Sequence, residues 1–412
     1  MMLRSTQIAG AVRWNRSRRK LLSSVAAVLE SRAVIEISGV DAKALLQGLV
    51  TNDVSLLDDG EGGRPCIPAA FLNPKGRVLG DALVTRSPRQ AAKRKPGYLL
   101  DCPQSVAEGL KTHLKLYKLR SKVKIKDATA TYDVLVSGVQ DPWHTAAESR
   151  GGGDQSAAPK NAAGEADAGA VGRVARFADP RCAALGVRVI RPKGSSDVSW
   201  PDGDTLVPEN RYDALRIFNG VGEGSELVDS IPLESNLDLL GAISFTKGCY
   251  VGQELTARTQ FKGFVRKRIL PVLFPANGAH ASASPIRGSS RVAADAGDGQ
   301  GPLLLQAWGA GKGEVAPSPP EAGSKIVDRA AEDGKVGTLV KASPEYNVGL
   351  ALFRLGKIMS TSGPGGSANP AVDCCVLDGA GQGEAELLRR CLPLTPPWWP
   401  VGLNPATGKV PA

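Results

Sequence analysis

The sequence predicts an α+β protein made of a mixed α+β body, a smaller β domain after it and an irregular tail. Its 412 residues and 43.0 kDa exceed the ~250–300 residues at which single hydrophobic cores stop growing, so more than one unit is expected. A hydrophobic content of 42% with 22% charged residues is typical of globular proteins and excludes a wholly disordered chain. Apolar residues recur with both strand and helix spacing in the body, which indicates mixed secondary structure.

The N-terminal segment has the composition of an organellar address. Residues 1–29 contain six basic side chains and no acid, and without these six charges the formal net charge of +10 falls to +4. A segment that is rich in arginine and free of acids is typical of a transit peptide, which we predict for residues 1–30. A disordered basic tail is the alternative. Because arginine is more frequent in this segment than either serine or threonine, the mitochondrial matrix is favoured over the plastid as the location.

The body is expected to begin near Ser31 with a strand and a helix. Residues 32–37 (RAVIEI) alternate like a short strand, and Gly39 ends it. Asp41 can cap a helix whose apolar stripe is formed by Leu45, Leu46 and Leu49.

A second helix and strand follow around residue 105. Residues 105–108 (SVAE) have the pattern of a capping box, and apolar residues then recur at helical spacing: Leu110, Leu114 and Tyr117. Val123 and Ile125 alternate with lysines, which predicts a half-buried strand.

The rest of the chain is divided by two segments that cannot build a core. Residues near 145–172 and near 275–302 are mostly small or charged, so we expect disordered insertions or linkers there. Residues 334–340 and 348–353 resemble the short strands of a small barrel. The expected organisation is a transit segment over 1–30, a body over 31–264, a C-terminal β-barrel domain over 265–356 and an irregular tail over 357–412.

Several classes of protein are excluded or disfavoured. No stretch approaches the ~18 uncharged apolar residues needed to cross a bilayer, so membrane insertion is not expected. Seven cysteines without a dense, even framework argue against a disulfide-stapled secreted protein. The chain has only three histidines, which are widely separated in the sequence, and this argues against a histidine-rich metal enzyme. Nucleic-acid binding is also disfavoured, because aromatic residues amount to only 5% of the chain.

The chemically densest segment runs from Ser244 to Arg268. Gly248 and Gly252 bracket Cys249, so the backbone there can turn sharply and approach a ligand. Cations near this cysteine favour its thiolate, which attacks electrophiles or binds a soft metal; they are Lys247, Arg258 and Lys262. The alternative is a small buried side chain at the start of a helix, since no His or Asp partner can be placed beside the thiol.

Residues 247–254 (KGCYVGQE) resemble the hallmark of the YgfZ-type folate-binding family, which is related to the glycine-cleavage T protein and includes mitochondrial iron–sulfur cluster assembly factors. Other segments match in the same order, and the resemblance covers residues 31–355 apart from the two insertions. The matching segments are 46–53 (LQGLVTND), 72–77 (LNPKGR), 116–123 (LYKLRSKV), 216–220 (RIFNG) and 231–237 (IPLESNL).

This resemblance implies a three-domain, T-protein-like arrangement around a central folate-sized cavity. Residues 31–264 then form two interleaved α+β folate-binding domains, and the small β-barrel follows. In the relatives the cavity accepts tetrahydrofolate. The seven basic residues between Lys111 and Lys126 then offer a rim for the folate carboxylates, although a solvated face is the more ordinary fate of such lysines.

Departures from the T protein bear on the reaction. The T protein carries an acid that helps to hold the pterin, and this chain has Phe218 at that position. The T protein also has a pair of aspartates, and the corresponding residues here are Gly80 and Asp81. The T protein lacks the cysteine that this chain has at Cys249. A thiolate is a natural ligand for iron, so these differences favour cluster maturation over glycine cleavage.

The resemblance therefore implies an accessory factor that matures [4Fe–4S] clusters together with A-type iron–sulfur carrier proteins. Cys249 is the expected catalytic residue, as the contact to a transient iron–sulfur cluster or to the carrier. The residues expected to bind the cofactor or hold its loop are Lys247, Gly248, Tyr250, Gly252, Gln253, Glu254, Arg258 and Asn236. True enzymatic turnover is left open. The alternatives are a folate-dependent aminomethyl or one-carbon transferase and a folate-linked tRNA-modification partner.

Overall fold

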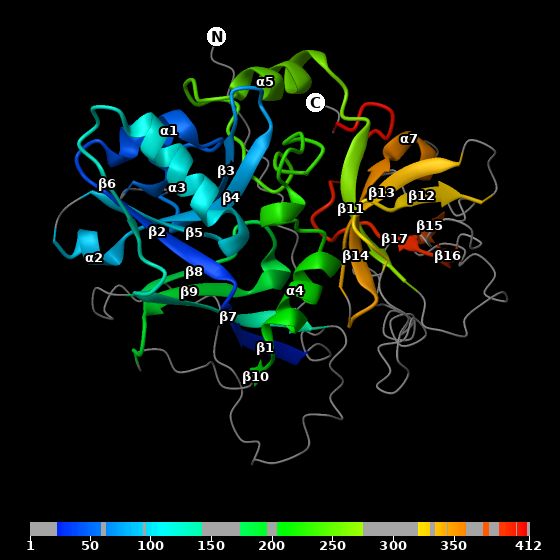
Figure 1. Cartoon of the computed structure of the whole chain (residues 1–412), viewed down its shortest axis with the longest axis horizontal. Coiled ribbons are helices and arrows are strands. Elements are labelled where there is room, and N and C mark those ends of the chain that lie inside the picture. Colours follow the sequence, from blue (N-terminus) through cyan, green and yellow to red (C-terminus); the bar gives the residue numbers. More distant parts are fainter. Residues whose placement is uncertain are drawn as a thin grey trace, which may run out of the picture.

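The computed structural model describes residues 23–58, 63–93, 96–141, 174–195, 204–274, 320–329, 334–343, 345–359, 374–378, 387–400 and 402–409. The insertions predicted near 145–172 and 275–302 lie outside these ranges, as do the first 22 residues of the predicted transit segment. The described residues form three β-sheets with helices packed on them (Figure 1).

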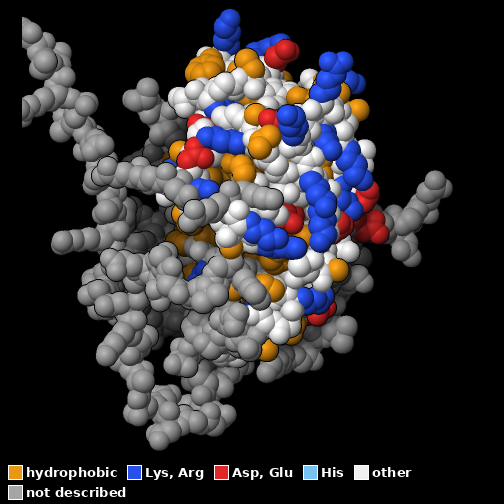
Figure 2. Space-filling model, turned by 90° about the vertical axis from the view of Figure 1, so that its left-hand side faces the viewer, with side chains coloured by type: hydrophobic (Ala, Val, Ile, Leu, Met, Phe, Trp, Pro, Cys, Tyr) orange, Lys and Arg blue, Asp and Glu red, His pale blue; other side chains and the backbone are white. Residues whose placement is uncertain are grey.

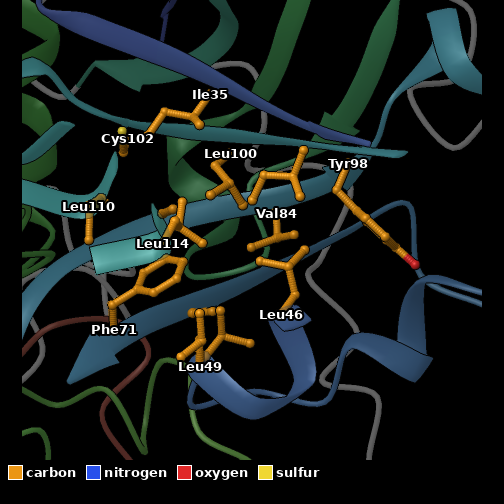
Figure 3. Close-up of a cluster of buried hydrophobic side chains, with 14 of the residues drawn as sticks. Ile35, Leu46, Leu49, Phe71, Val84, Tyr98, Leu100, Cys102, Leu110 and Leu114 are labelled. Atoms are coloured by element: carbon orange, nitrogen blue, oxygen red, sulfur yellow. The ribbon is translucent and has the colours of Figure 1, made fainter. Parts of the chain in front are cut away.

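The first sheet is wholly antiparallel, in the order β3-β4-β5-β2-β6. Two helices, α1 (Ala42–Leu49) and α3 (Gln104–Lys118), pack on it through the apolar stripes that their sequences predict. Figure 3 shows the resulting core, in which leucines of both helices surround Phe71 and Val84. The strands are β2 (Arg32–Ser38), β3 (Cys66–Leu72), β4 (Val78–Arg86), β5 (Gly97–Pro103) and β6 (Lys124–Asp127).

The caps of these helices differ from the prediction although the helices are confirmed. The carboxylate of Asp41 precedes α1 but accepts a hydrogen bond from the Lys122 amide at 2.7 Å instead of capping the helix. The capping box at residues 105–108 does not form, because α3 begins one residue before Ser105, after Pro103.

The second sheet packs against the other face of the first, in the order β10-β1-β7-β9-β8. Strand β2 is therefore buried on both faces: Ile35 contacts the core under the helices, and Val34 contacts the core between the sheets. Helix α4 (Glu209–Phe218) also packs there. The strands are β1 (Ser23–Val28), β7 (Tyr132–Asp141), β8 (Ala175–Ala178), β9 (Val187–Pro192) and β10 (Thr205–Leu206).

Strand β1 corrects the predicted boundary of the transit segment. It lies within residues 1–30, yet it is hydrogen-bonded to both β7 and β10, and Val25, Ala26 and Ala27 are buried. Its small side chains (SSVAAV) look like leader composition but fit the close packing between the sheets. Cleavage at residue 30 removes an inner strand of the sheet, so the folded body begins by residue 23.

The third sheet has seven strands in the order β16-β15-β12-β13-β14-β11-β17 and curls to one side of the molecule (Figure 1). The two strands predicted in this region are confirmed. Since β16 and β17 occupy opposite ends of the order, the described part of the predicted small β-barrel is an open, curled sheet. The strands are β11 (Lys267–Leu273), β12 (Lys325–Asp328), β13 (Lys335–Ala342), β14 (Val348–Arg354), β15 (Cys374–Asp378), β16 (Leu387–Arg390) and β17 (Leu392–Pro393).

The tail predicted to be irregular over 357–412 supplies three of these strands, so that prediction was wrong. Strand β15 pairs with β12, and β17 pairs with β11. Such short strands are stabilised by their long-range partners, and their sequences carry little periodic signal. The vicinal Cys374 and Cys375 are buried in β15.

A C-terminal strap, defined here as residues 392–409, runs from the third sheet to helix α5 (Gln253–Lys262). It starts in β17, and the Trp398 indole donates a hydrogen bond to the Asn219 carbonyl at 2.7 Å. The carbonyl of Thr407 accepts from the Val265 amide at 2.8 Å, and the Lys409 ammonium donates to the Gln260 carbonyl in the last turn of α5. The strap thus fixes the C-terminal end of α5.

A buried ionic cluster connects all three sheets. At its centre, Glu223 accepts from Arg32 of β2 at 2.6 Å and from Arg181, and it lies 3.7 Å from Arg216 of α4. Arg216 also pairs with Glu226, which is 3.0 Å from the ammonium of Lys341 on β13. The remaining members are Asp101, Asp179, Arg188 and Asp213.

No helix in the described part of the chain is long and apolar enough to cross a membrane.

Candidate functional site

Three of the motifs that carry the family resemblance meet around one surface loop, residues 244–252. The loop is bonded to the end of α1 and the residues after it: Ser244 donates its amide to Thr51, and Val251 donates to Gly48, both at 3.0 Å. The Thr51 hydroxyl in turn donates to the Ala242 carbonyl at 2.6 Å. The turn at 73–76 contacts the other end of the loop. Segments some 200 residues apart in the sequence therefore build the Cys249 loop together.

Lys247 fastens this loop to helix α1. Its ammonium donates three hydrogen bonds, to the carbonyl oxygens of Gln47 at 2.8 Å, Val50 at 2.7 Å and Asn52 at 2.8 Å. A lysine has three N–H donors, so all are used, and a cation at the C-terminal end of a helix is also favoured by the helix dipole. Burial lowers the pKa of Lys247 to about 8, against the opposing influence of Asp53. Lys247 therefore holds the loop and does not point its charge at the thiol.

Replacing Lys247 by methionine is expected to loosen the loop. The variant keeps the apolar stem but leaves three carbonyl groups without their donor, which we expect to lower the free energy of unfolding by about 2–3 kcal/mol. Urea unfolding measures the stability, and the rate at which a maleimide labels Cys249 reports on the loop. Lys262→Met, at an exposed position of α5, is the matched control. Equal stability and labelling in both variants contradict this role for Lys247.

The two glycines of the loop have different roles. Gly252 has a φ of +78°, and a Cβ there would lie 2.3 Å from the Asn73 carbonyl oxygen, so only glycine fits. Gly76, with a φ of +77°, faces it in the turn, where a Cβ would lie 2.6 Å from Leu255. Gly248 is exposed with open space around it. The sharp turn predicted around Cys249 is therefore confirmed at Gly252 and not at Gly248.

Tyr250 and Gln253 complete the internal support of the loop. The Gln253 side chain accepts a hydrogen bond from the Tyr250 amide at 3.1 Å and so closes the turn into α5. The Tyr250 ring lies 5.1 Å from the Lys247 ammonium. Burial raises the pKa of the Tyr250 hydroxyl. Both residues were predicted to contact a cofactor, and in the structure the Gln253 side-chain oxygen and the Tyr250 amide are bonded to each other.

Cys249 is exposed, whereas the other six cysteines are buried. Burial raises the pKa of Cys66, Cys102 and Cys182, which keeps those thiols protonated and inert. The buried-cysteine alternative for Cys249 is therefore wrong. Glu254 and Arg258, both predicted site residues, are also exposed on α5, at the surface that follows the loop.

Two phenylalanines at this surface were missed by the sequence analysis. Phe261 is 69% exposed and Phe264 is 58% exposed, and Phe261 packs edge-on against Phe245 with ring centroids 6.2 Å apart. We call Phe245, Phe261 and Phe264 the aromatic patch. The sequence did contain a signal for Phe261, because α5 is largely polar. The helix buries only Thr256, so it has no apolar face that would carry this phenylalanine into a core.

Asn236 lies in a structural position and not in the Cys249 loop. Its side chain is fully buried, donates to the Ile269 carbonyl at 2.6 Å and accepts from Arg268 at 3.3 Å. It therefore joins the segment before the loop to β11.

Neither of two cavities in the described residues is lined by a residue predicted to bind tetrahydrofolate. The cavity beside Asp81 measures about 10 Å³, room for one water molecule, whereas ligand pockets measure about 300–1,000 Å³. Between the first and third sheets, apolar side chains of β3, β4, α4, β11 and β14 pack together, and the partly buried Phe218 contacts them. A second cavity of about 320 Å³ lies beside the ionic cluster, but its cations Arg32, Arg216 and Lys341 are already paired, and no residue predicted to bind folate lines it. The basic residues between Lys111 and Lys126 line neither cavity.

Asp81, the remaining acid of the T-protein pair, is expected to make stability depend on pH. Its carboxylate accepts from the Gly224 amide at 2.7 Å, and burial together with the charge of Glu223 raises its pKa to about 6. The folded state then holds this proton more tightly than the unfolded state, so stability falls as the pH rises from about 4 to 6 and levels off above. Asp81→Asn keeps the acceptor without the charge, and we expect it to gain about 1–3 kcal/mol at neutral pH.

Urea unfolding of Asp81→Asn near pH 4.5 and near pH 7.5 measures this effect. Asp53→Asn is the control of opposite sign: partial burial opposes the shift, but hydrogen bonds from Ser55 and Gln47 lower the pKa of Asp53, so its loss destabilises the protein at neutral pH. An Asp81→Asn variant that is less stable than the wild type at neutral pH contradicts the expectation.

No family model matches the chain, but solved and curated proteins do. The structure resembles the crystal structure of the glycine cleavage system aminomethyltransferase T from Bartonella henselae, with a TM-score of 0.55 and 12% identity over 91% of this chain and 86% of that one. The protein thus has the aminomethyltransferase T fold, as the sequence predicted.

Curated relatives identify the family within that fold. The iron–sulfur cluster assembly factor IBA57 homolog of Mycosarcoma maydis, named as mitochondrial, is 34% identical over 380 residues, which are 90% of this chain and 83% of the relative. The corresponding protein of Neurospora crassa is 34% identical over 90% of this chain and 80% of its own, and the Homo sapiens IBA57 is 33% identical over 67% and 75%. The chain belongs to the IBA57 family of mitochondrial iron–sulfur cluster assembly factors, and its predicted mitochondrial location is confirmed.

Proposed function

We propose that this protein assists mitochondrial iron–sulfur cluster assembly by presenting the Cys249 thiolate as one ligand of a cluster whose other ligands come from a partner. The observation that carries the proposal is that Cys249 is exposed at the end of a loop held rigidly by the Lys247 hydrogen bonds and Gly252. The names of the relatives place this family in cluster assembly.

A single thiolate cannot hold a cluster alone. Iron–sulfur clusters are ordinarily bound by four ligands, mostly cysteine thiolates. No group of three or more His, Cys, Asp or Glu side chains in the described residues is arranged to hold a metal ion. The cluster is therefore cargo shared with another protein, and an A-type carrier that delivers [2Fe–2S] units for [4Fe–4S] maturation is the partner that we propose.

The aromatic patch supplies a docking surface for that partner. Exposed aromatic side chains near a reactive group are typical of interface anchors. Arg258 and Lys262 on the same helix offer charges that can pair with acids of the carrier. Phe261 lies near the C-terminal end of α5 and Cys249 precedes its N-terminal end, so a partner that docks along the whole helix brings its ligands to the thiol.

Reconstitution with a carrier tests the proposal. The protein is mixed with an A-type carrier loaded with [2Fe–2S], and the complex is followed by size-exclusion chromatography and by visible circular dichroism of the cluster. We expect a new cluster spectrum with the wild type, complex formation without that spectrum for Cys249→Ser, and at least tenfold weaker association for Phe261→Ser. Leu206→Ser, a similarly exposed apolar position on β10, is the control. An unchanged spectrum with Cys249→Ser rejects the role of the thiol.

Tetrahydrofolate binding is a separate proposal, and no step above depends on it. The aminomethyltransferase T fold motivates it, but the cavity beside Asp81 must open before a pterin can enter. Calorimetric titration with tetrahydrofolate tests it, and we expect Asp81→Leu, which fills part of this cavity, to weaken any binding that is measured. Absence of binding at millimolar ligand leaves the cluster proposal intact.

A further inference from the structure

Three large apolar side chains project into solvent at one corner of the first sheet. Leu119 is 84% exposed, Val40 is 69% exposed and Leu116 is 67% exposed. Val40 and Leu119 lie beside two segments that are in contact. The Lys122 amide donates to Asp41, and a Cβ at Gly39 would lie 2.1 Å from the Lys122 carbonyl oxygen. We call residues 115–126 together with Val40 the α3–β6 corner.

Basic side chains surround these apolar residues. Six lysines and arginines lie between residues 115 and 126 with no acid among them: Lys115, Lys118, Arg120, Lys122, Lys124 and Lys126. The acids beside the corner are engaged, since Asp41 accepts from the Lys122 amide, and Glu108 and Asp127 both pair with Lys111. Figure 2 shows lysine and arginine side chains gathered over the face that contains the left-hand elements of Figure 1, with few acidic side chains between them.

Protection of a sheet edge explains only part of this pattern. Strand β6 is the last strand of the first sheet, and lysines on edge strands commonly prevent pairing with another chain. That role does not account for exposed leucines, which favour association. Leu119 also has a φ of +44°, which glycine adopts far more readily than leucine does. At the end of a helix, a residue with positive φ is usually glycine.

We propose that the α3–β6 corner docks this protein on the surface of an anionic phospholipid bilayer. Apolar side chains that enter the interface, ringed by cations that meet lipid phosphates, are typical of peripheral membrane attachment. The corner lines neither of the described cavities, and it offers no exposed aromatic side chain on which nucleic-acid bases could stack. An anionic bilayer offers phosphates that pair with the cations of the corner and an apolar interior that buries its exposed leucines and valine.

The location of the corner leaves the cluster site free. Helix α1 has eight residues, a length of about 12 Å. The corner adjoins the start of α1 at Val40 and Asp41, whereas Lys247 binds the carbonyls at its end. A molecule attached through the corner can therefore keep Cys249 open to a soluble partner.

Vesicle flotation tests the proposal. Because the N-terminal segment is itself basic, every protein carries glutamine at Arg13, Arg16, Arg18 and Arg19, outside the described fold. Binding is compared between vesicles of phosphatidylcholine alone and vesicles that also contain phosphatidylglycerol. We expect binding only to the anionic vesicles, weakened by salt.

Paired variants separate the apolar from the electrostatic contribution. Leu116→Ser with Leu119→Gly, and Lys122→Gln with Lys124→Gln, are each expected to weaken binding roughly tenfold. The controls Leu206→Ser and Lys325→Gln with Lys335→Gln, at exposed positions of other sheets, are expected to change it less than about twofold. Leu119→Gly relieves the backbone at that position, so lost binding cannot be attributed to lost folding.

Three results overturn the proposal: no binding of the parent protein to anionic vesicles, unchanged binding of the leucine pair, or lysine-dependent binding to tRNA or to an acidic polypeptide in the absence of vesicle binding. Cluster transfer with the carrier in solution is unaffected by any of these results, so the two proposals fail independently.

Discussion

A Cys249→Ser chain is expected to fold like the wild type and to fail in cells that lack their own member of this family. Aconitase activity and protein lipoylation, which both need [4Fe–4S] clusters, should recover with the wild type and stay near the level of the empty vector with the variant. The reason is chemical. The thiol is exposed, so little packing is lost, but a serine hydroxyl is a far poorer ligand for iron than a thiolate.

Thr246→Ala is the matched control for this experiment, since it alters an exposed side chain of the same loop without removing a metal ligand. We expect it to rescue both activities when the proteins are expressed equally. If Cys249→Ser rescues as well as Thr246→Ala does, the thiol has no part in maturation. If neither activity recovers with the wild type but glycine cleavage does, the aminomethyltransferase interpretation takes its place.

Glu223→Gln is expected to cause the largest loss of stability of any conservative change in the described fold. The carboxylate lies between three guanidinium groups, those of Arg32, Arg181 and Arg216, and is almost fully buried. Breaking a buried charge network by removing one partner costs about 3–5 kcal/mol, a large share of the ~5–15 kcal/mol that stabilises a typical domain. Since the cluster joins all three sheets, we expect one cooperative transition at lower urea and a fall in soluble protein.

The pH profile adds an independent check on this prediction. The surrounding arginines hold the pKa of Glu223 well below its usual value, in spite of its burial. Its stabilising contribution is therefore complete above about pH 4.5 and is lost as the pH falls below that value. The free energy of unfolding of Glu223→Gln should therefore change less with pH below about 4.5 than that of the wild type. Glu254→Gln, at an exposed acid on α5, should match the wild type. A variant of wild-type stability at neutral pH rules out this role for the cluster.

The family and the fold could be predicted because they depend on local motifs and periodic patterns. Residues 247–254 and 46–53 are read directly from the sequence, and the apolar stripes of α1 and α3 give their buried faces. The roles of the motif residues could not be predicted in the same way. Lys247, Gln253 and Asn236 look like ligand-binding side chains, yet their partners are chiefly backbone groups, which no residue type reveals.

The missed elements share a physical cause as well. Strand β1 and strand β15 are short segments with few large apolar residues, and long-range pairing, not their own propensity, makes them strands. The ionic cluster brings together residues from 32 to 341, so no spacing in the sequence predicts it. Phe261, in contrast, could have been noticed as an apolar residue in a largely polar helix, and Phe264 follows two residues after that helix ends.

The C-terminal strap ties the completion of the site to the order of synthesis. Residues 392–409 are synthesised well after α5, and they fix the end of this helix opposite Cys249 through Thr407 and Lys409. The helix that follows the thiol is therefore unanchored while the chain is being made. A premature stop codon or a bulky fusion near Lys409 can disturb the reactive cysteine without altering any residue of its loop.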